Sequence, residues 1–402
     1  MNRMTRWDIM REVYLDNAST TRVGDKPARA AADAMTVCWG NPSSRHSMGV
    51  AAESIIKQAR AAISAELGAK DGDVYFTSGG TEANNMAILG AARARRKNGL
   101  RVITSAVEHA SVNDAFTQLE REGFDVVRVK TSPTGVVDLC DVANAIDDQT
   151  ILCSFMLVNN ETGAINPISD ISALLHQRRP NAVMHCDAVQ GFGKLPVKVS
   201  SLGCELITVS GHKIHAPMGV GALYCSRRTT LQPLMFGGSQ QRELRTSAPD
   251  SYRPGTEPVP LIAAFGEAVR GLPAPAQRLV SIRTLNALLR ERLASPSLNE
   301  EVNAHMTFNS DEACAPTIFS FATGCIKSET MLNYLSAQGI YVSSGSACSK
   351  GKKSRVLEAL GLADSIADST LRISFSAENT EEDVELFCEA LRNGLKTLVR
   401  FK

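Results

Sequence analysis

Short apolar runs alternate with helical segments between about residues 50 and 225, and this alternation restricts the possible folds more than any other feature of the chain. Residues 51–67 carry apolar side chains at helical spacing, and residues 81–97 are rich in alanine and predict a second helix. Strands separated by helices are typical of a mainly parallel α/β sheet that is buried on both faces. The predicted strands cover residues 74–77, 102–105, 126–129, 151–158, 183–187, 206–210 and 221–225.

The pattern changes after residue 225. Residues 226–260 are polar and rich in Gly, Pro and Ser, which predicts a long functional loop. Beyond them a smaller α+β unit is predicted, and a chain of 402 residues suits two domains. We predict a large domain over residues 13–260 and a small domain over 261–402, with residues 1–12 packed nearby or forming a loose leader. The small unit is predicted to have helices at 260–270, 329–337, 355–360 and 381–399, and strands at 317–321, 340–342 and 371–374.

Charge and composition exclude several classes of protein. Lys plus Arg number 43 and Asp plus Glu 42, and this balance argues against a nucleic-acid binder or a membrane-surface protein. No run approaches the ~18–20 apolar residues of a membrane span, and the N-terminus has no secretory signal, so a cytoplasmic location is predicted. The ten cysteines include no CxxC pair and no Cys/His cluster with zinc-finger spacing, so no metal site is predicted.

Chemically active side chains follow the predicted strands, where an open parallel sheet binds its ligands. Ser78-Gly79-Gly80-Thr81 begins a helix whose free N–H groups favour a phosphate, although a plain turn capped by Thr81 explains this string equally well. Each of the other residues also has an ordinary structural explanation when it is taken alone. Together they supply what pyridoxal phosphate (PLP) needs: a lysine for an imine, a carboxylate for the ring nitrogen, an aromatic ring for stacking and donors for the phosphate. These other residues are His109, Asn160, Asp187, Gln190 and Lys213.

Ten short strings then carry a resemblance that spans nearly the whole chain. They are YLDNASTT at 14–21, NPSSRHSMG at 41–49, FTSGGTEANN at 76–85, EHASV at 108–112, VNNETG at 158–163, HCDAVQ at 185–190, SGHKIHAPMGVGALY at 210–224, RPGTEPVP at 253–260, SSGSACS at 343–349 and LRISFSAENT at 371–380. In this order they resemble the cysteine desulfurases, which are class V aminotransferase-like PLP enzymes. The resemblance implies the α/β fold type I of PLP-dependent transferases, a homodimer, and conversion of L-cysteine to L-alanine with transfer of sulfur to an acceptor protein.

The resemblance also implies how PLP is held. Lys213 would bind it as a Schiff base, Asp187 would pair with the ring nitrogen, and Gln190 would bond the ring hydroxyl. His109 would stack on the ring and shuttle protons. The remaining cofactor contacts would come from Gly80, Thr81, Asn160, Ser210 and His212, with Thr256, or in its place Thr246, reaching across from the other subunit.

The substrate and its sulfur are assigned by the same resemblance. Asn160 and Arg372 would bind the substrate carboxylate, and Cys348 would take up the sulfur as a persulfide. A lone cysteine is more often a small buried residue, but Cys348 lies among small and charged residues that are typical of a loop. An aminotransferase needs no such cysteine. Selenocysteine lyase or another fold-type I PLP enzyme is the alternative function.

A non-catalytic paralogue is a third interpretation, and it is disfavoured because Lys213, Asp187, Arg372 and Cys348 occur together. The destination of the sulfur stays open between iron–sulfur cluster assembly and the thiolation of tRNA or a cofactor. A basic run follows Cys348, and we expect it either to favour the thiolate or to steer an acidic acceptor. This run contains Lys350, Lys352, Lys353 and Arg355.

Overall fold

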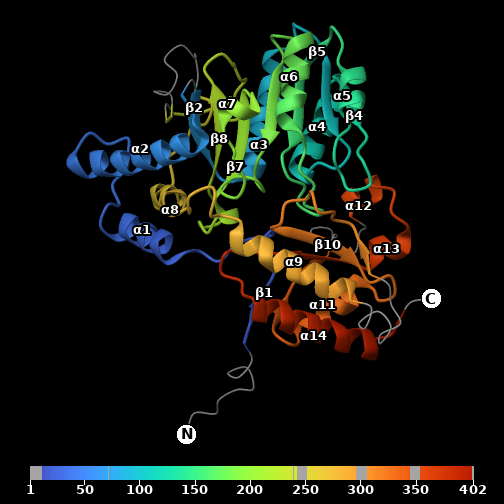
Figure 1. Ribbon diagram of the computed structural model, residues 1–402. Helices are drawn as coiled ribbons and strands as arrows, with labels where there is room; N and C mark the ends of the chain where they lie inside the picture. Colours follow the sequence, from blue (N-terminus) through green and yellow to red (C-terminus); the bar gives the residue numbers. More distant parts are fainter. Residues whose placement is uncertain are drawn as a thin grey trace.

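A seven-stranded sheet forms the centre of the larger part of the molecule (Figure 1). The computed structural model describes residues 11–70, 72–238, 240–241, 251–295, 306–344 and 354–400. The strand order is β2-β8-β7-β6-β5-β3-β4, and only β8 runs against its neighbours, so the predicted mainly parallel α/β sheet is confirmed. The strands are β2 (Gly72–Thr77), β3 (Arg101–Ser105), β4 (Asp125–Val129), β5 (Thr150–Met156), β6 (Val183–Asp187), β7 (Leu206–Ser210) and β8 (Gly221–Ser226).

Helices cover both faces of this sheet, which explains why its central strands are apolar throughout. Every residue of β5, β6 and β7 is buried. Successive residues point to opposite faces, so Val102 and Ile103 of β3 belong to two different apolar clusters. The helices between the strands are α3 (Gly80–Ala94), α4 (Ala110–Arg121), α5 (Leu139–Ala145), α6 (Ile168–Arg178) and α7 (Val199–Leu202).

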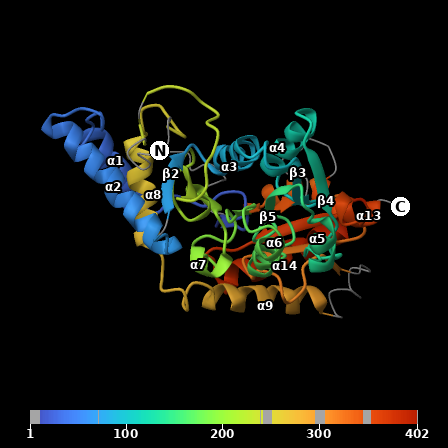
Figure 2. The ribbon, with the colours of Figure 1, turned by 90° about the horizontal axis from the view of Figure 1, so that it is seen from above.

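Three helices pack side by side at one end of the sheet (Figure 2). They are α1 (Asp25–Thr36), α2 (Ser47–Leu67) and α8 (Val259–Arg270). The helix α2 begins four residues before its predicted start, because the His46 side chain accepts a hydrogen bond from the Gly49 N–H and caps it. It ends where Gly68 adopts a left-handed φ of 62°, which favours glycine. No helix or strand occurs among the described residues between β8 and α8, in keeping with the loop predicted there.

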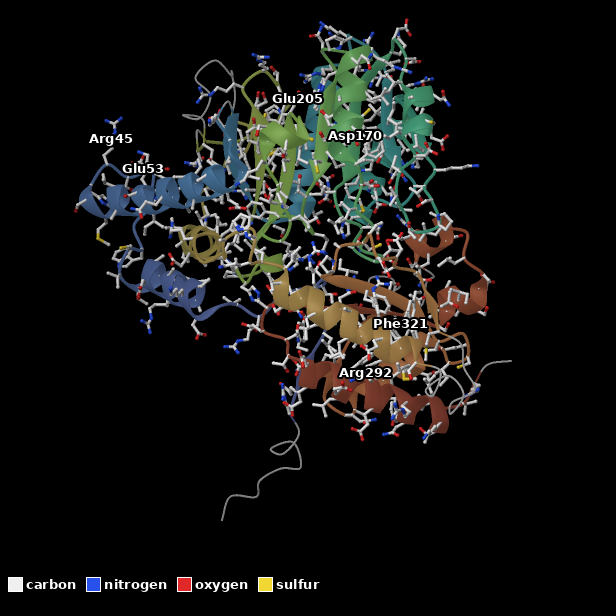
Figure 3. All side chains as sticks on the ribbon, viewed as in Figure 1. Arg45, Glu53, Asp170, Glu205, Arg292 and Phe321 are labelled. Carbon is white, nitrogen blue, oxygen red and sulfur yellow. The ribbon has the colours of Figure 1, made fainter. Side chains whose placement is uncertain are left out.

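The C-terminal unit is built on a four-stranded antiparallel sheet in the order β12-β13-β10-β9. Its core contains Phe319 and Phe321, the second of which is labelled in Figure 3. The N-terminal strand β1 (Val13–Tyr14) pairs in parallel with β11 (Ile340–Tyr341). The other elements are β9 (Thr307–Phe308), β10 (Ile318–Ala322), β12 (Ser343–Ser344), β13 (Thr370–Ser374), α9 (Val280–Ala294), α11 (Ser328–Ser336), α12 (Arg355–Ala359), α13 (Asp364–Asp368) and α14 (Glu381–Thr397).

The first residues of the predicted large domain pack in the C-terminal unit, whereas the helix at its C-terminal boundary packs on the large sheet. Val13 and Leu15 belong to the C-terminal core, and Arg11 donates a hydrogen bond to Asp383 at the start of α14. Conversely, α8 lies across the predicted boundary at residue 260 and packs on α1 and α2 in the core of the large sheet. The boundary itself stays a prediction. Within the described ranges, no helix has the length and apolar character that crossing a membrane requires.

Candidate active site

A cavity of about 340 Å³ lies where the strands of the large sheet end, and Arg372 of β13 reaches it from the C-terminal unit. Thr256 is exposed and does not line this cavity. Cys348 and Thr246 lie outside the described residues. The other ten predicted site residues all line the cavity: Gly80, Thr81, His109, Asn160, Asp187, Gln190, Ser210, His212, Lys213 and Arg372.

Asp187, the last residue of β6, is held by two hydrogen bonds. Its Oδ2 accepts from Asn84 Nδ2 at 2.7 Å, and its Oδ1 accepts from the Val189 N–H at 3.0 Å. Asn84 is buried on α3, one helical turn after Gly80, and it also lines the cavity. Asn84 was not predicted as a site residue from the sequence, although its spacing from Gly80 places both residues on one face of the helix. These contacts present an oriented carboxylate, as the nitrogen of a pyridinium ring requires.

His109 begins α4 and caps it. Its Nδ1 accepts from the Ser111 N–H at 3.2 Å and lies 2.8 Å from Ser111 Oγ, which in turn accepts from Asn84. Burial lowers the pKa of His109, and the charge of Lys213 lowers it further, while Asp187 opposes the shift. The imidazole is therefore a neutral ring of fixed orientation, suited to stacking on a flat heterocycle.

Lys213 lies in a short 3₁₀ turn directly after β7. Its Nζ donates to the carbonyl oxygens of Ala18 and Ser19, at 2.7 and 2.5 Å. The N-terminal string at 14–21 thus supplies the backbone that holds this ammonium. Burial lowers the pKa of the neighbouring His212 to about 4, and the charges of Lys213 and Lys194 add to the effect, so His212 is neutral near pH 7.

The part of the cavity lined by Gly80, Thr81 and Ser210 offers hydrogen-bond donors for an anion. Gly80 and Thr81 form the N-terminus of α3, where backbone N–H groups have no partner within the helix. Ser210 Oγ is buried and has no hydrogen-bond partner among the described residues. Burying a hydroxyl without a partner costs free energy, and a phosphate oxygen bound there would supply that partner. The lysine, the carboxylate, the aromatic ring and these donors therefore fit PLP.

Arg372 is buried and held from three sides. Its Nη1 donates to the Asn160 carbonyl oxygen at 2.8 Å, while its Nη2 donates to Asp16 Oδ1 at 2.8 Å and to Ser19 Oγ at 2.7 Å. Its Nε is buried without a partner among the described residues, as is Asn160 Oδ1. Of its N–H donors, the buried Nε–H is therefore left for a carboxylate. Asp16, which the sequence analysis missed, orients this group.

The described residues nearest to Cys348 on either side, up to Ser344 and from Ser354, lie in segments that contact Arg372 and Glu161. Ser343 pairs with Arg372 in the sheet, and on the far side Ser354 Oγ donates to Glu161 Oε2 at 2.5 Å. Burial raises the pKa of Glu161 to about 7, against the lowering effects of Ser354 and Arg372. Ser343 thus pairs with Arg372, a predicted substrate-binding residue, and Ser354 contacts Glu161, the neighbour of Asn160 in the chain.

Known proteins are similar to this chain over nearly its whole length. The family model described as Aminotransferase class-V matches residues 13–387. Cysteine desulfurase IscS of Methanosarcina thermophila is 37% identical over 381 residues, covering 94% of this chain and 91% of that protein. Among solved structures, a NifS-like protein superposes with a TM-score of 0.86 at 32% identity, covering 96% of this chain and 100% of that one. SspA in complex with cysteine gives a TM-score of 0.75 at 30% identity, covering 92% of this chain and 100% of that one.

Proposed function

The chain belongs to the cysteine desulfurases of the aminotransferase class-V family, which are PLP-dependent and act on cysteine, and from this premise we propose which of its residues carry the reaction. The observation that carries the proposal is the convergence of ten predicted residues on one cavity. PLP, when bound, withdraws electrons from the bonds at the substrate's Cα. Lys213 would hold it covalently, Asp187 would face its ring nitrogen, and His109 would stack on the ring. Gln190 donates to the ring oxygen, and the phosphate is bound by Gly80, Thr81, Ser210 and His212.

Arg372 and Asn160 bind the substrate carboxylate. The Nε–H of Arg372, which has no partner among the described residues, donates to this carboxylate and so helps to hold the substrate's Cα–H bond in one direction. Lys213 would be the base that accepts the substrate's Cα proton. Its Nζ already lies at the cavity wall, held by two backbone carbonyls.

Cys348 receives the sulfur. Its thiolate attacks the substrate sulfur, so that an S–S bond forms as the Cβ–S bond breaks and the electron pair stays with the carbon fragment. Protonation of that fragment yields L-alanine, and the sulfur remains as a persulfide on Cys348. The pairing of Ser343 with Arg372 and the contact of Ser354 with Glu161, which follows Asn160 in the chain, support this role.

The active form is a homodimer, with Thr256 of each subunit contributing to the phosphate site of the other. Its exposure leaves it accessible to a partner. The surface exposes several large apolar side chains of the kind that a subunit interface buries. They include Met35, Val37, Trp39, Val50, Met218, Met235 and Phe236.

The acceptor is a protein with an acidic docking surface, which the basic run after Cys348 would attract. A cytoplasmic location fits the nine described cysteines, none of which forms a disulfide. The pathway that uses the sulfur stays open between iron–sulfur cluster assembly and thiolation.

The test is to assay sulfide and alanine from L-cysteine, with L-selenocysteine alongside, for the wild-type enzyme and for Cys348→Ala. The variant should keep PLP, bind L-cysteine and show a spectral change, yet release almost no sulfide. Cys140→Ala, which removes an exposed cysteine far from this segment in the chain, is the matched control and should behave as wild type. Normal sulfide release by Cys348→Ala would refute the persulfide route and favour direct elimination. Turnover of L-selenocysteine alone would support the lyase alternative.

A further inference from the structure

Lys194 lies beside the cavity but has no part in the reaction described above. It follows Gln190 by four residues, and its Nζ donates to Gln190 Oε1 at 3.1 Å. The backbone between them forms a tight turn, in which the Lys194 N–H donates to the Gly191 carbonyl oxygen at 3.0 Å. Gly193 has a φ of 74°, and a Cβ there would lie 2.7 Å from Ile214 Cγ2, so only glycine fits without strain. The turn therefore sets where the lysine side chain starts.

Two independent contacts orient the Gln190 amide in the same way. A protonated lysine only donates, so the atom that faces Lys194 must be the amide oxygen. A backbone carbonyl only accepts, so the atom that faces the Ala18 carbonyl at 2.8 Å must be the amide nitrogen. Gln190 is buried and lines the cavity. The second N–H of its amide nitrogen is thus left for a ligand in the cavity.

The lysine is half-buried, and no carboxylate among the described residues forms an ion pair with it. Burial lowers its pKa to about 7, and the charges that add to this shift are both cations, Lys213 and Arg372. An unpaired ammonium among other cations destabilises the fold, and an apolar side chain of the same length would avoid that cost. Such a placement is expected where the charge or the donor serves the site.

We propose that Lys194 is a positioning residue that keeps the Gln190 amide nitrogen turned toward the ring oxygen of PLP and strengthens it as a donor. Below its pKa of about 7, Lys194 is a cation at the amide oxygen, which polarises the amide, and the N–H then stabilises an anionic ring oxygen more strongly. The proposal rests on the proposed function, in which Gln190 contacts that oxygen. The Lys213 nitrogen, when it is bound to PLP, would then hold its proton less tightly.

The test follows the visible absorbance of the holoenzyme across a pH series, without any substrate. Lys194→Met keeps the length of the side chain and removes both its charge and its donor. We expect the pH midpoint of the spectral change to rise by about one unit, because the anionic oxygen loses support. Lys194→Arg should restore the wild-type midpoint. Lys97→Met, at an exposed lysine on the surface, is the matched control and should show no shift.

A double variant shows whether the lysine acts through the amide. In a Gln190→Leu background, Lys194→Met should add little further shift. A wild-type midpoint in Lys194→Met would overturn the proposal. An equal shift in the Gln190→Leu background would also overturn it, because the lysine would then act on the cofactor directly. If Lys194→Met does not fold, Lys194→Gln repeats the comparison with a neutral side chain, and an unchanged midpoint there refutes the idea equally. Failure of the proposed function is distinguishable, since the wild-type enzyme itself would then lack the PLP absorbance or form no alanine from L-cysteine.

Discussion

Replacing Arg372 with lysine is expected to weaken the capture of L-cysteine without loss of PLP. The arginine makes three hydrogen bonds from two nitrogens, to the Asn160 carbonyl, Asp16 and Ser19, and still has a donor for the substrate. A lysine presents its donors from a single atom, so it cannot keep these contacts and also donate to a carboxylate from the position of the arginine Nε–H. A hydrogen bond to a charged group contributes about 1.5–3 kcal/mol. Loss of one such bond corresponds to a fall of about 10- to 150-fold in kcat/KM.

Most of this fall is expected in KM, because the carboxylate is bound before and during the reaction alike. The assay measures alanine formation over a range of L-cysteine concentrations, together with PLP content. Arg292→Lys, on the outer surface of α9 where Arg292 pairs with Glu385, is the matched control and should leave both values unchanged. An unaffected kcat/KM in Arg372→Lys would show that another residue binds the carboxylate.

Three further outcomes are expected. Lys213→Ala should abolish turnover and the absorbance of lysine-bound PLP, and an unchanged spectrum would show that another residue holds the cofactor. Burial raises the pKa of Glu161 from 4.5 to about 7, so its contribution to stability is complete below pH 4.5 and is lost as the pH rises through about 7. Thermal unfolding should therefore show wild type losing stability relative to Glu161→Gln over that range, and parallel curves would contradict this. Sulfur transfer to the physiological acceptor should lose its salt dependence when the basic residues after Cys348 are neutralised, whereas sulfide release with a small thiol should change little; equal losses in both reactions would assign the cluster to the thiolate alone. The residues to be replaced with Gln are Lys350, Lys352 and Lys353.

The local sequence predicts most strands of the large sheet and the site residues that directly follow those strands. Apolar runs between helices predict strands at nearly their observed bounds, although 151–158 ends early, at Met156. Parallel strands share one carboxyl edge, so the residues after them meet there, and this brings Asp187 and Lys213 to one cavity. The strand order, and the reversal of β8, could not be predicted, since several pairings bury the same apolar residues equally well.

The tertiary structure alone decided the contacts that tune the site. Arg372 meets Asp16 although 356 residues separate them, and β1 pairs with β11 over a similar distance in the chain. Lys194 contacts the Gln190 amide, and the orientation of that amide depends on the position of the Ala18 carbonyl. No sequence pattern near Gln190 predicts that position. Spacing along the chain specifies which face of a helix or strand a residue occupies. A hydrogen bond between residues far apart in the chain forms only when distant helices and strands pack together. Its geometry therefore depends on the positions of all the elements between the two residues.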